Sequence, residues 1–236
     1  MRNHRNTRGD SERLTFVHGN GVAGPAAWPQ QLDAFPASGF LTMPGFGEDE
    51  EPVVDFSIWI DRIVDDLDER AVLVAHSYGG IAAVLAAGKA RDRITELVLI
   101  EPALHALKGT GQAVADDIER LAPVLENARE RDLEEFWQEF FPAVIGAPAP
   151  PLSSPQARRQ ARRAQALPPS WSFDLPDDVF DAVSTTIVTS GDNPVYEDIA
   201  ATLLRRDANH VLIPDHGHRP QDSPTFTQLL LKILER

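Results

Sequence analysis

Cysteine is absent from the 236-residue sequence. Its absence excludes a disulfide framework, a thiol nucleophile and a cysteine-based metal site, and it is typical of proteins from a reducing compartment. The sequence also lacks an apolar run long enough to span a bilayer, and the polar segment from Met1 to Asp10 lacks the apolar core of a signal peptide. We therefore expect a cytoplasmic protein whose residues 1–12 are disordered.

Basic residues are scarce relative to acidic ones. The chain has 22 Lys and Arg against 36 Asp and Glu, which gives a formal net charge of −14. Because a protein that binds nucleic acid or an anionic membrane needs clustered Lys and Arg to neutralise phosphates, we expect neither partner. We expect a small-molecule substrate instead, and the composition leaves the oligomeric state open. The length suits one large α/β domain or two small ones, and nothing in the composition requires a division.

Short apolar runs that end in Gly or Pro turns alternate with helical patterns along most of the chain. These runs predict strands at residues 14–17, 39–43, 71–75, 96–100, 186–189 and 210–213. Regular alternation of strand and helix is typical of a parallel sheet with helices on both faces. The sequence therefore predicts an α/β fold with a mostly parallel, doubly wound sheet of about six strands.

The alternation stops between residues 103 and 183, where amphipathic helical patterns take over. One pattern begins at Asp132 and carries an unusually aromatic face. Its apolar residues are Leu133, Phe136, Trp137, Phe140 and Phe141. We predict a helical cap over 103–183, inserted into a core formed by 13–102 and 184–236. The aromatic face is interpreted as a roof over a substrate pocket, with ordinary core packing as the alternative. A basic run at 157–163 is interpreted as a solvated helix face.

The segment Ala75-His76-Ser77-Tyr78-Gly79 follows the most apolar of these strand runs and leads into a helix of small residues. A strand that reverses sharply into a helix holds its corner residue in a strained backbone conformation, which requires small neighbours. Ser77 would then stand at a helix N-terminus, where the helix dipole favours developing negative charge. The segment therefore has the features of a nucleophile elbow.

Three motifs together resemble those of the α/β-hydrolase family. They are the oxyanion-loop-like segment 16–21, the nucleophile elbow at 75–80, and a late Gly217-His218 turn, in the family's order. The resemblance covers the chain from about Leu14 to its end, although the family's N-terminal hairpin has no room before Leu14. It implies a serine-nucleophile enzyme with a cap.

The resemblance also implies site residues. Ser77 would be the nucleophile and His218 the base, which the Gly-His junction favours over His216. The backbone N–H groups of Asn20 and Tyr78 would form an oxyanion hole. We also expect Gly19, His76, His105, Trp137 and Phe141 to line the substrate pocket.

The triad acid has two candidates. The family most often places its carboxylate after the strand at 186–189 and just before a proline, and that position holds Asn193, with Asp192 one residue early. Other members place the acid after the strand that follows the elbow helix, where this chain has Glu101. Because Asn193 cannot serve as the acid, we favour Glu101 and keep Asp192 as the alternative.

We therefore expect a serine hydrolase that cleaves a small, mostly uncharged ester or related acyl compound. The same residues also suit C–C hydrolysis, hydroxynitrile cleavage, acyl transfer and cofactor-free perhydrolysis. A non-catalytic, ligand-binding homologue is the alternative from another class. No His and carboxylate cluster has metal-ligand spacing, so we expect no metal and no cofactor.

Overall fold

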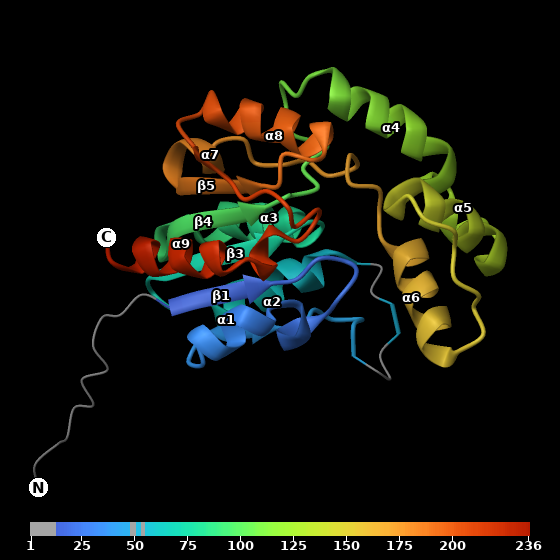
Figure 1. The fold of residues 1–236 in the computed structure, drawn as a ribbon, viewed down its shortest axis with the longest axis horizontal. Helices are drawn as coiled ribbons and strands as arrows, with labels where there is room; N and C mark the ends of the chain where they lie inside the picture. Colours follow the sequence, from blue (N-terminus) through green and yellow to red (C-terminus); the bar gives the residue numbers. More distant parts are fainter. Residues whose placement is uncertain (1–12, 48–50, 53–54) are drawn as a thin grey trace, which may run out of the picture.

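The computed structural model describes residues 13–47, 51–52 and 55–236, so the disorder expected for 1–12 lies outside the described residues. Six strands form one parallel sheet in the order β2-β1-β3-β4-β5-β6 (Figure 1). The strands are β1 (Arg13–Val17), β2 (Gly39–Leu41), β3 (Ala71–His76), β4 (Ile94–Ile100), β5 (Ser184–Thr189) and β6 (Asn209–Leu212). The predicted α/β class and the number of strands are confirmed.

Alternating side chains of the central strands enter two separate hydrophobic clusters. In β3, Leu73 and Ala75 belong to one cluster, whereas Val72 and Val74 belong to the other. Successive side chains of a strand point to opposite faces, so a strand that is apolar throughout must be covered on both sides. All six residues of β3 are buried.

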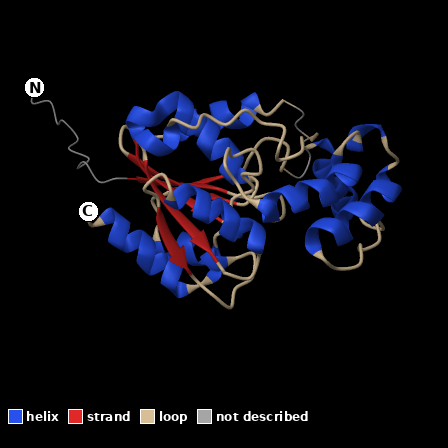
Figure 2. Ribbon diagram, turned by 90° about the horizontal axis from the view of Figure 1, so that it is seen from above, coloured by secondary structure: helices blue, strands red, loops and turns tan. Residues whose placement is uncertain are grey.

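Helices cover both faces of the sheet (Figure 2). The face with Leu73 is covered by α2 (Ser57–Asp66), α3 (Gly79–Ala90), α7 (Val179–Ala182) and α8 (Pro194–Leu204). The opposite face is covered by α1 (Pro29–Ala34) and α9 (Pro224–Leu234). Short 3-10 turns lie at Gly24–Ala27, Arg91–Arg93, Ala128–Glu130 and Pro220–Asp222. Ser223 and Asn193 cap α9 and α8 because their side chains accept from backbone N–H groups of the first turn.

Three helices, α4 (Gln112–Leu125), α5 (Leu133–Ile145) and α6 (Pro155–Ala166), form a cap beside the sheet, on the side away from the C-terminus (Figure 1). Asp132 caps α5 by accepting from the N–H groups of Glu134 (2.9 Å) and Glu135 (3.1 Å). The cap has its own hydrophobic cluster, which runs from Val124 to Ala164. The end of the 103–183 segment packs elsewhere, since Val179 and Phe180 belong to the core of the main domain.

The carboxyl ends of the strands meet at one edge of the sheet. Neighbours β1 and β3 are followed by connections that lead in opposite directions, to β2 and to β4, so the strand order reverses between them. In open α/β sheets, ligands bind outside the carboxyl ends of the strands at such a reversal. Within the part of the chain that the structure describes, no helix is both long and apolar enough to cross a membrane.

Candidate active site

Ser77 occupies the turn between β3 and α3 in a left-handed backbone conformation, with φ of 53°. Non-glycine residues rarely adopt this conformation, which costs energy unless the surrounding structure enforces it. Here Ser77 N–H donates to Ile100 O (2.9 Å), and Ser77 O accepts from Gly80 N–H and Ala103 N–H. The strand, the helix and the loop after β4 therefore fix the corner from three sides.

Two glycines allow the loop after β1 to approach the turn that carries Ser77. A Cβ atom on Gly79 would lie 2.3 Å from His18 O, so only glycine fits between the elbow and the loop after β1. A Cβ atom on Gly19 would lie 3.0 Å from the Cβ of Ser77. The loop that carries Gly19 and Asn20 thus lies directly against the serine. Tyr78 precedes α3, so its N–H belongs to the end of the helix where backbone donors lack intrahelical partners.

A chain of short contacts joins Ser77, His218 and Glu101. Ser77 Oγ lies 2.9 Å from His218 Nε2, and His218 Nδ1 lies 2.7 Å from Glu101 Oε2. Because the carboxylate can only accept, Nδ1 carries the proton and Nε2 is left to accept from the serine hydroxyl. The imidazole side chain is 44 % exposed, whereas that of Glu101 is 1 % exposed. The structure thus brings together three residues from the ends of β3 and β4 and the loop after β6.

Glu101 is held by the neighbouring strand. Its Oε1 accepts from the N–H of Ser190 (2.9 Å) and from the Ser190 hydroxyl (2.6 Å), and its own N–H donates to Val188 O (2.9 Å). These bonds accompany a left-handed conformation at Glu101, with φ of 39°. A buried carboxylate needs such donors because burial without them disfavours its charge. The side chain is therefore fixed in the orientation that faces His218.

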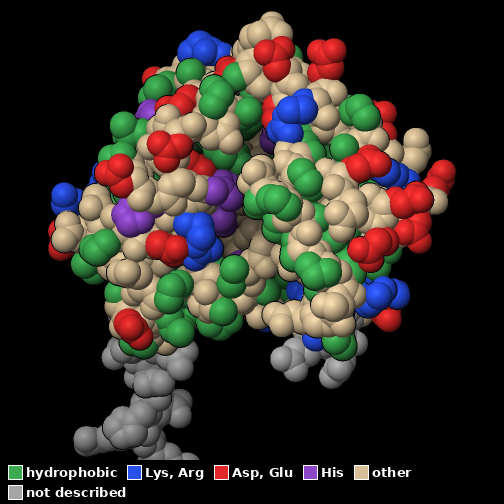
Figure 3. All heavy atoms as spheres, turned by 45° about the vertical axis from the view of Figure 1, so that its right-hand side comes forward, with side chains coloured by type: hydrophobic (Ala, Val, Ile, Leu, Met, Phe, Trp, Pro, Cys, Tyr) green, Lys and Arg blue, Asp and Glu red, His purple; other side chains and the backbone are tan. Residues whose placement is uncertain are grey.

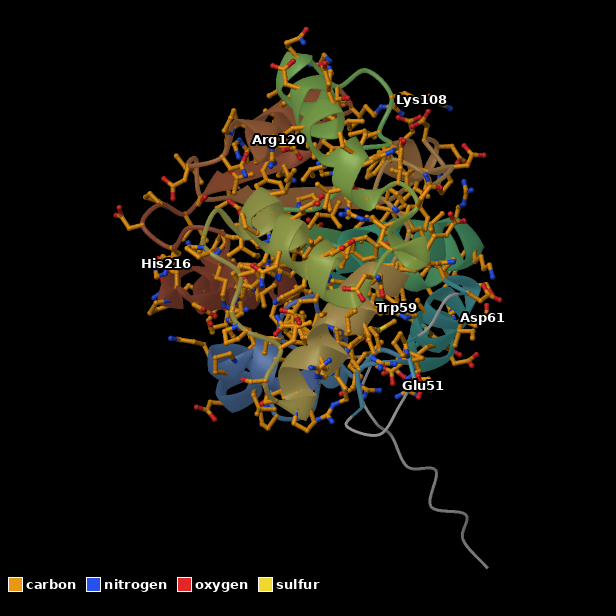
Figure 4. The ribbon with its side chains drawn as sticks, turned by 90° about the vertical axis from the view of Figure 1, so that its right-hand side faces the viewer. Glu51, Trp59, Asp61, Lys108, Arg120 and His216 are labelled. Carbon is orange, nitrogen blue, oxygen red and sulfur yellow. The ribbon has the colours of Figure 1, made fainter. Side chains whose placement is uncertain are left out.

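Asp192, the alternative acid, is exposed, and its N–H donates to Ser190 Oγ (3.3 Å). Asn193 lies at the position where the acid was first expected, and it caps α8: its Oδ1 accepts from Val195 N–H (2.9 Å). Of the two predicted carboxylates, the structure brings Glu101 to His218. The other late histidine, His216, is exposed and lies at the outer edge of the molecule (Figure 4).

Two further histidines are buried at the site in neutral form. His76 Nε2–H donates to the backbone oxygen of His218 (2.8 Å), and burial, together with the charge of His218, lowers the pKa of His76 well below its usual value. His18 Nδ1–H donates to Gly19 O (2.6 Å), while His18 Nε2 accepts from Met43 N–H (3.0 Å). Burial lowers the pKa of His18 to about 4. Both rings therefore hold the loops around Ser77 rather than carry charge.

The low pKa of His18 predicts that the protein loses stability as the pH falls. The unfolded chain binds a proton at His18 below about pH 6.5, and the folded chain binds it only near pH 4. The free energy of unfolding should therefore fall between pH 6.5 and 4, with up to about 3 kcal/mol from this residue. Urea unfolding of the parent and of His18→Gln, which cannot titrate, checks this expectation. An equal pH slope in both proteins would contradict it.

His105 lies in a buried network between the core and the cap. Its Nε2 lies 3.0 Å from Asp117 Oδ2 in α4, and its Nδ1 lies 2.9 Å from Ser170 Oγ in the segment that leaves α6. Burial raises the pKa of Asp117, but the hydrogen bonds from His105 and Arg120 outweigh this effect and hold that pKa below its usual value. His105 was expected to line the substrate pocket. In the structure both of its ring nitrogens form hydrogen bonds, which connect the loop after β4 to α4 and to the segment after α6.

Replacing His105 by leucine should therefore destabilise the protein. The change leaves the buried hydroxyl of Ser170 and one oxygen of Asp117 without their partner, which costs about 1–3 kcal/mol for each unsatisfied group. Chemical denaturation measures the loss, with His216→Leu as the matched control because surface histidines contribute within about 0.5 kcal/mol. A loss no larger than that of the control would show that the network does not stabilise the fold.

The structure places Trp137 and Phe141 in the cap. Trp137 is buried, and its indole N–H donates to Pro150 O (2.9 Å). Phe141 packs on Trp137 with ring centroids 5.0 Å apart. The aromatic face of α5 therefore packs against α4 and α6, which agrees with the core-packing alternative for this stripe.

Other aromatic residues surround the ring of Tyr78, the residue after Ser77. The Tyr78 ring contacts the rings of Phe56 (5.7 Å), Trp59 (6.3 Å) and Phe173 (6.2 Å), and the Tyr78 hydroxyl donates to Pro168 O (2.7 Å). Of these residues only Tyr78 could be predicted from the sequence, because it follows Ser77 directly. Figure 3 shows a hollow between the core and the cap, with histidine side chains exposed beside it.

Comparison with known proteins agrees with this arrangement. The model of the alpha/beta hydrolase family matches residues 16–227. The chain belongs to the alpha/beta hydrolase family. It is accordingly an enzyme of the hydrolase class, as the three sequence motifs predicted.

Relatives with known names include esterases. A pimeloyl-[acyl-carrier protein] methyl ester esterase of Shewanella sp. (strain MR-7) is 31% identical over 99 residues, which are 41% of this chain and 37% of that protein. The match thus spans little more than a third of the length of that relative. Among solved structures, MenH from S. aureus (20% identity, TM-score 0.64) covers 97% of this chain and 95% of its own. A thermophilic esterase from Thermogutta terrifontis (20% identity, TM-score 0.63) covers 96% of this chain and 90% of its own. At this identity the two structures show a common fold.

Proposed function

We propose that this hydrolase uses Ser77, His218 and Glu101 as a catalytic triad to cleave a small, mostly uncharged ester or related acyl compound. The single observation that supports the proposal most strongly is the continuous chain of contacts, 2.9 Å from serine to histidine and 2.7 Å from histidine to carboxylate. The strained backbone of Ser77 adds to it, because such strain is typical of functional residues.

In the proposed reaction, Ser77 Oγ attacks the carbonyl carbon of the substrate while His218 Nε2 takes the hydroxyl proton. The imidazolium formed at His218 is stabilised by the ionised carboxylate of Glu101, which keeps Nδ1 protonated throughout. His218 then gives its proton to the departing alcohol, and an acyl group stays on Ser77. A water molecule, deprotonated by His218, then attacks the acyl carbon. As the bond between the acyl carbon and Ser77 Oγ breaks and the acid leaves, His218 returns its proton to Ser77 Oγ.

The backbone N–H groups of Asn20 and Tyr78 are the proposed donors to the oxygen that becomes negative in both tetrahedral intermediates. The close approach of Gly19 to Ser77 supports this assignment, since it brings the loop after β1 next to the start of α3. Removing one such donor typically slows an enzyme by about 10²- to 10³-fold. The dipole of α3 acts in the same direction.

The preference for an uncharged acyl group is proposed from the aromatic residues around Tyr78, which follows Ser77 in the turn. Tyr78 and Phe173 are only partly buried, and they adjoin Phe56 and Trp59, which are nearly inaccessible. Such rings favour apolar substrate groups. Small aliphatic and aromatic esters are therefore the proposed substrates.

Hydrolysis of a panel of chromogenic acyl esters tests the function. The proposal predicts turnover that depends on Ser77, with the highest kcat/KM for uncharged acyl groups and lower values for acyl chains that end in a carboxylate. C–C hydrolysis, hydroxynitrile cleavage, acyl transfer and perhydrolysis would use the same triad, and they are separated by the products formed from matched substrates. Binding of the esters without any turnover would contradict the proposal in favour of a non-catalytic homologue.

A further inference from the structure

The exposed imidazole of His218 lies against the ring of Tyr196. The two ring centroids are 5.1 Å apart and the planes differ by 17°, so the rings are stacked. Tyr196 stands in the first turn of α8, where its N–H donates to Asn193 O (3.2 Å). The capped helix therefore holds the tyrosine on one face of the histidine.

His218 needs such support because its own segment is irregular. It follows Asp215 and Gly217, both in left-handed conformations, in the loop after β6. The bond to Glu101 fixes Nδ1, whereas the bond to Ser77 is lost when Ser77 gives up its proton, which leaves the ring free to rock about Nδ1. Rocking would carry Nε2 away from Ser77 Oγ, which lies 2.9 Å away. A planar ring stacked on the imidazole opposes this motion.

A second ring limits the imidazole from another direction. The ring centroids of His76 and His218 are 4.7 Å apart, and their ring planes are tilted by 45°. His76 Nε2–H also donates to the backbone oxygen of His218. His76 thus fixes the main chain of the base, whereas Tyr196 contacts its ring. The two neighbours restrict different movements.

The phenol suits a place beside a base that becomes positively charged. Burial, together with the carboxylates of Glu101 and Asp117, raises the pKa of Tyr196, so the ring stays neutral. The face of an aromatic ring attracts cations, and the attraction is larger for imidazolium than for imidazole. The stack therefore strengthens as the proton moves from Ser77 to His218.

We infer that Tyr196 is a positioning residue of the triad, which keeps Nε2 of His218 aligned with Ser77 and favours its charged form through the ring face. The inference rests on the proposed function, because it requires His218 to act as the base. The aromatic ring is the acting group and the hydroxyl is not. This distinction separates Tyr196 from a residue that only fills space in α8.

Four variants of the whole 236-residue chain test the inference. Tyr196→Phe keeps the ring, Tyr196→Leu and Tyr196→Met keep apolar bulk without it, and Leu204→Ala is a matched control on the exposed side of α8. We expect Tyr196→Phe and Leu204→Ala to stay within about threefold of the parent. The leucine and methionine variants should lose about 10- to 100-fold in kcat with little change in KM, since misalignment of a reacting group has effects of this size.

The readout is kcat and KM for the best ester, together with the thermal midpoint of each variant. If either ring-less variant folds and retains the parent kcat, or if Tyr196→Phe falls as far as they do, the inference is overturned. A fall in thermal midpoint with parent kcat would also overturn it, because that result marks a structural role alone. An active parent whose turnover does not depend on Ser77 would instead overturn the proposed function, and the inference with it.

Discussion

Replacing Ser77 by alanine is expected to lower kcat for the best ester by about 10⁴- to 10⁶-fold, because the variant lacks the atom that forms the acyl bond. Alanine is smaller than serine, and the backbone bonds of residue 77 to Ile100, Gly80 and Ala103 stay in place. The fold should therefore persist. Steady-state hydrolysis measures the loss, and circular dichroism with a thermal scan measures the fold.

The matched control for this variant is Ser153→Ala, at an exposed position between α5 and α6. It should hydrolyse the ester at the parent rate. Parent-like turnover by a folded Ser77→Ala protein would contradict the nucleophile assignment.

Replacing Glu101 by glutamine is expected to lower kcat by about 10³- to 10⁴-fold. The N–H and hydroxyl of Ser190 both donate to Glu101 Oε1, so the glutamine must direct its oxygen to Ser190 and its NH₂ to His218. An NH₂ group facing Nδ1 favours the tautomer with the proton on Nε2. That tautomer cannot accept the proton of Ser77.

The comparison variant is Asp192→Asn, which should stay within about threefold of the parent, since Asp192 is exposed and contacts Ser190 through its backbone. The decisive measurement is kcat for both variants under the same conditions. A larger fall in Asp192→Asn than in Glu101→Gln would transfer the acid role to Asp192.

Much of the fold could be predicted from local patterns. The central strands were found because parallel strands buried on both faces appear as apolar runs bounded by Gly and Pro. The edge strand β6 is only partly buried, yet its apolar run was also found. The start of α5 was predicted because Asp132 is of a residue type that often precedes a helix, comes one residue before the apolar face and is followed by Glu135 in the first turn. Ser57, by contrast, has the residue type of a helix N-cap, yet it is the first residue of α2, and Asp55 accepts its N–H (2.9 Å). Asp55 and Ser57 are both residue types that commonly cap helices, so the sequence does not show which of the two does so.

The partner of an apolar helical face could not be predicted. The stripe of Trp137, Phe140 and Phe141 specifies that one side of α5 is covered, and the pattern is the same whether a pocket or another helix covers it. The structure shows α4 and α6 on that side. Similarly, His105 lies close to Glu101 in sequence, yet its partners are 12 and 65 residues away.

Within the site, Ser77, His218 and Glu101 were predicted from the resemblance of the motifs to those of the α/β-hydrolase family, with Glu101 favoured because Asn193 occupies the family's usual acid position. Tyr196 was missed because its contact depends on the direction of α8 and on the path of the loop after β6. Neither is encoded in a short motif. Contacts between side chains of distant segments thus require the tertiary structure.

The most direct test of the proposed triad is the location of the adduct formed by a fluorophosphonate probe. After reaction, proteolysis and mass spectrometry identify the modified residue. We expect one phosphonylated residue, Ser77, with labelling abolished in Ser77→Ala and slowed in Glu101→Gln. An adduct on another residue, or ester hydrolysis that continues at the parent rate after Ser77 has been fully modified, would contradict the account.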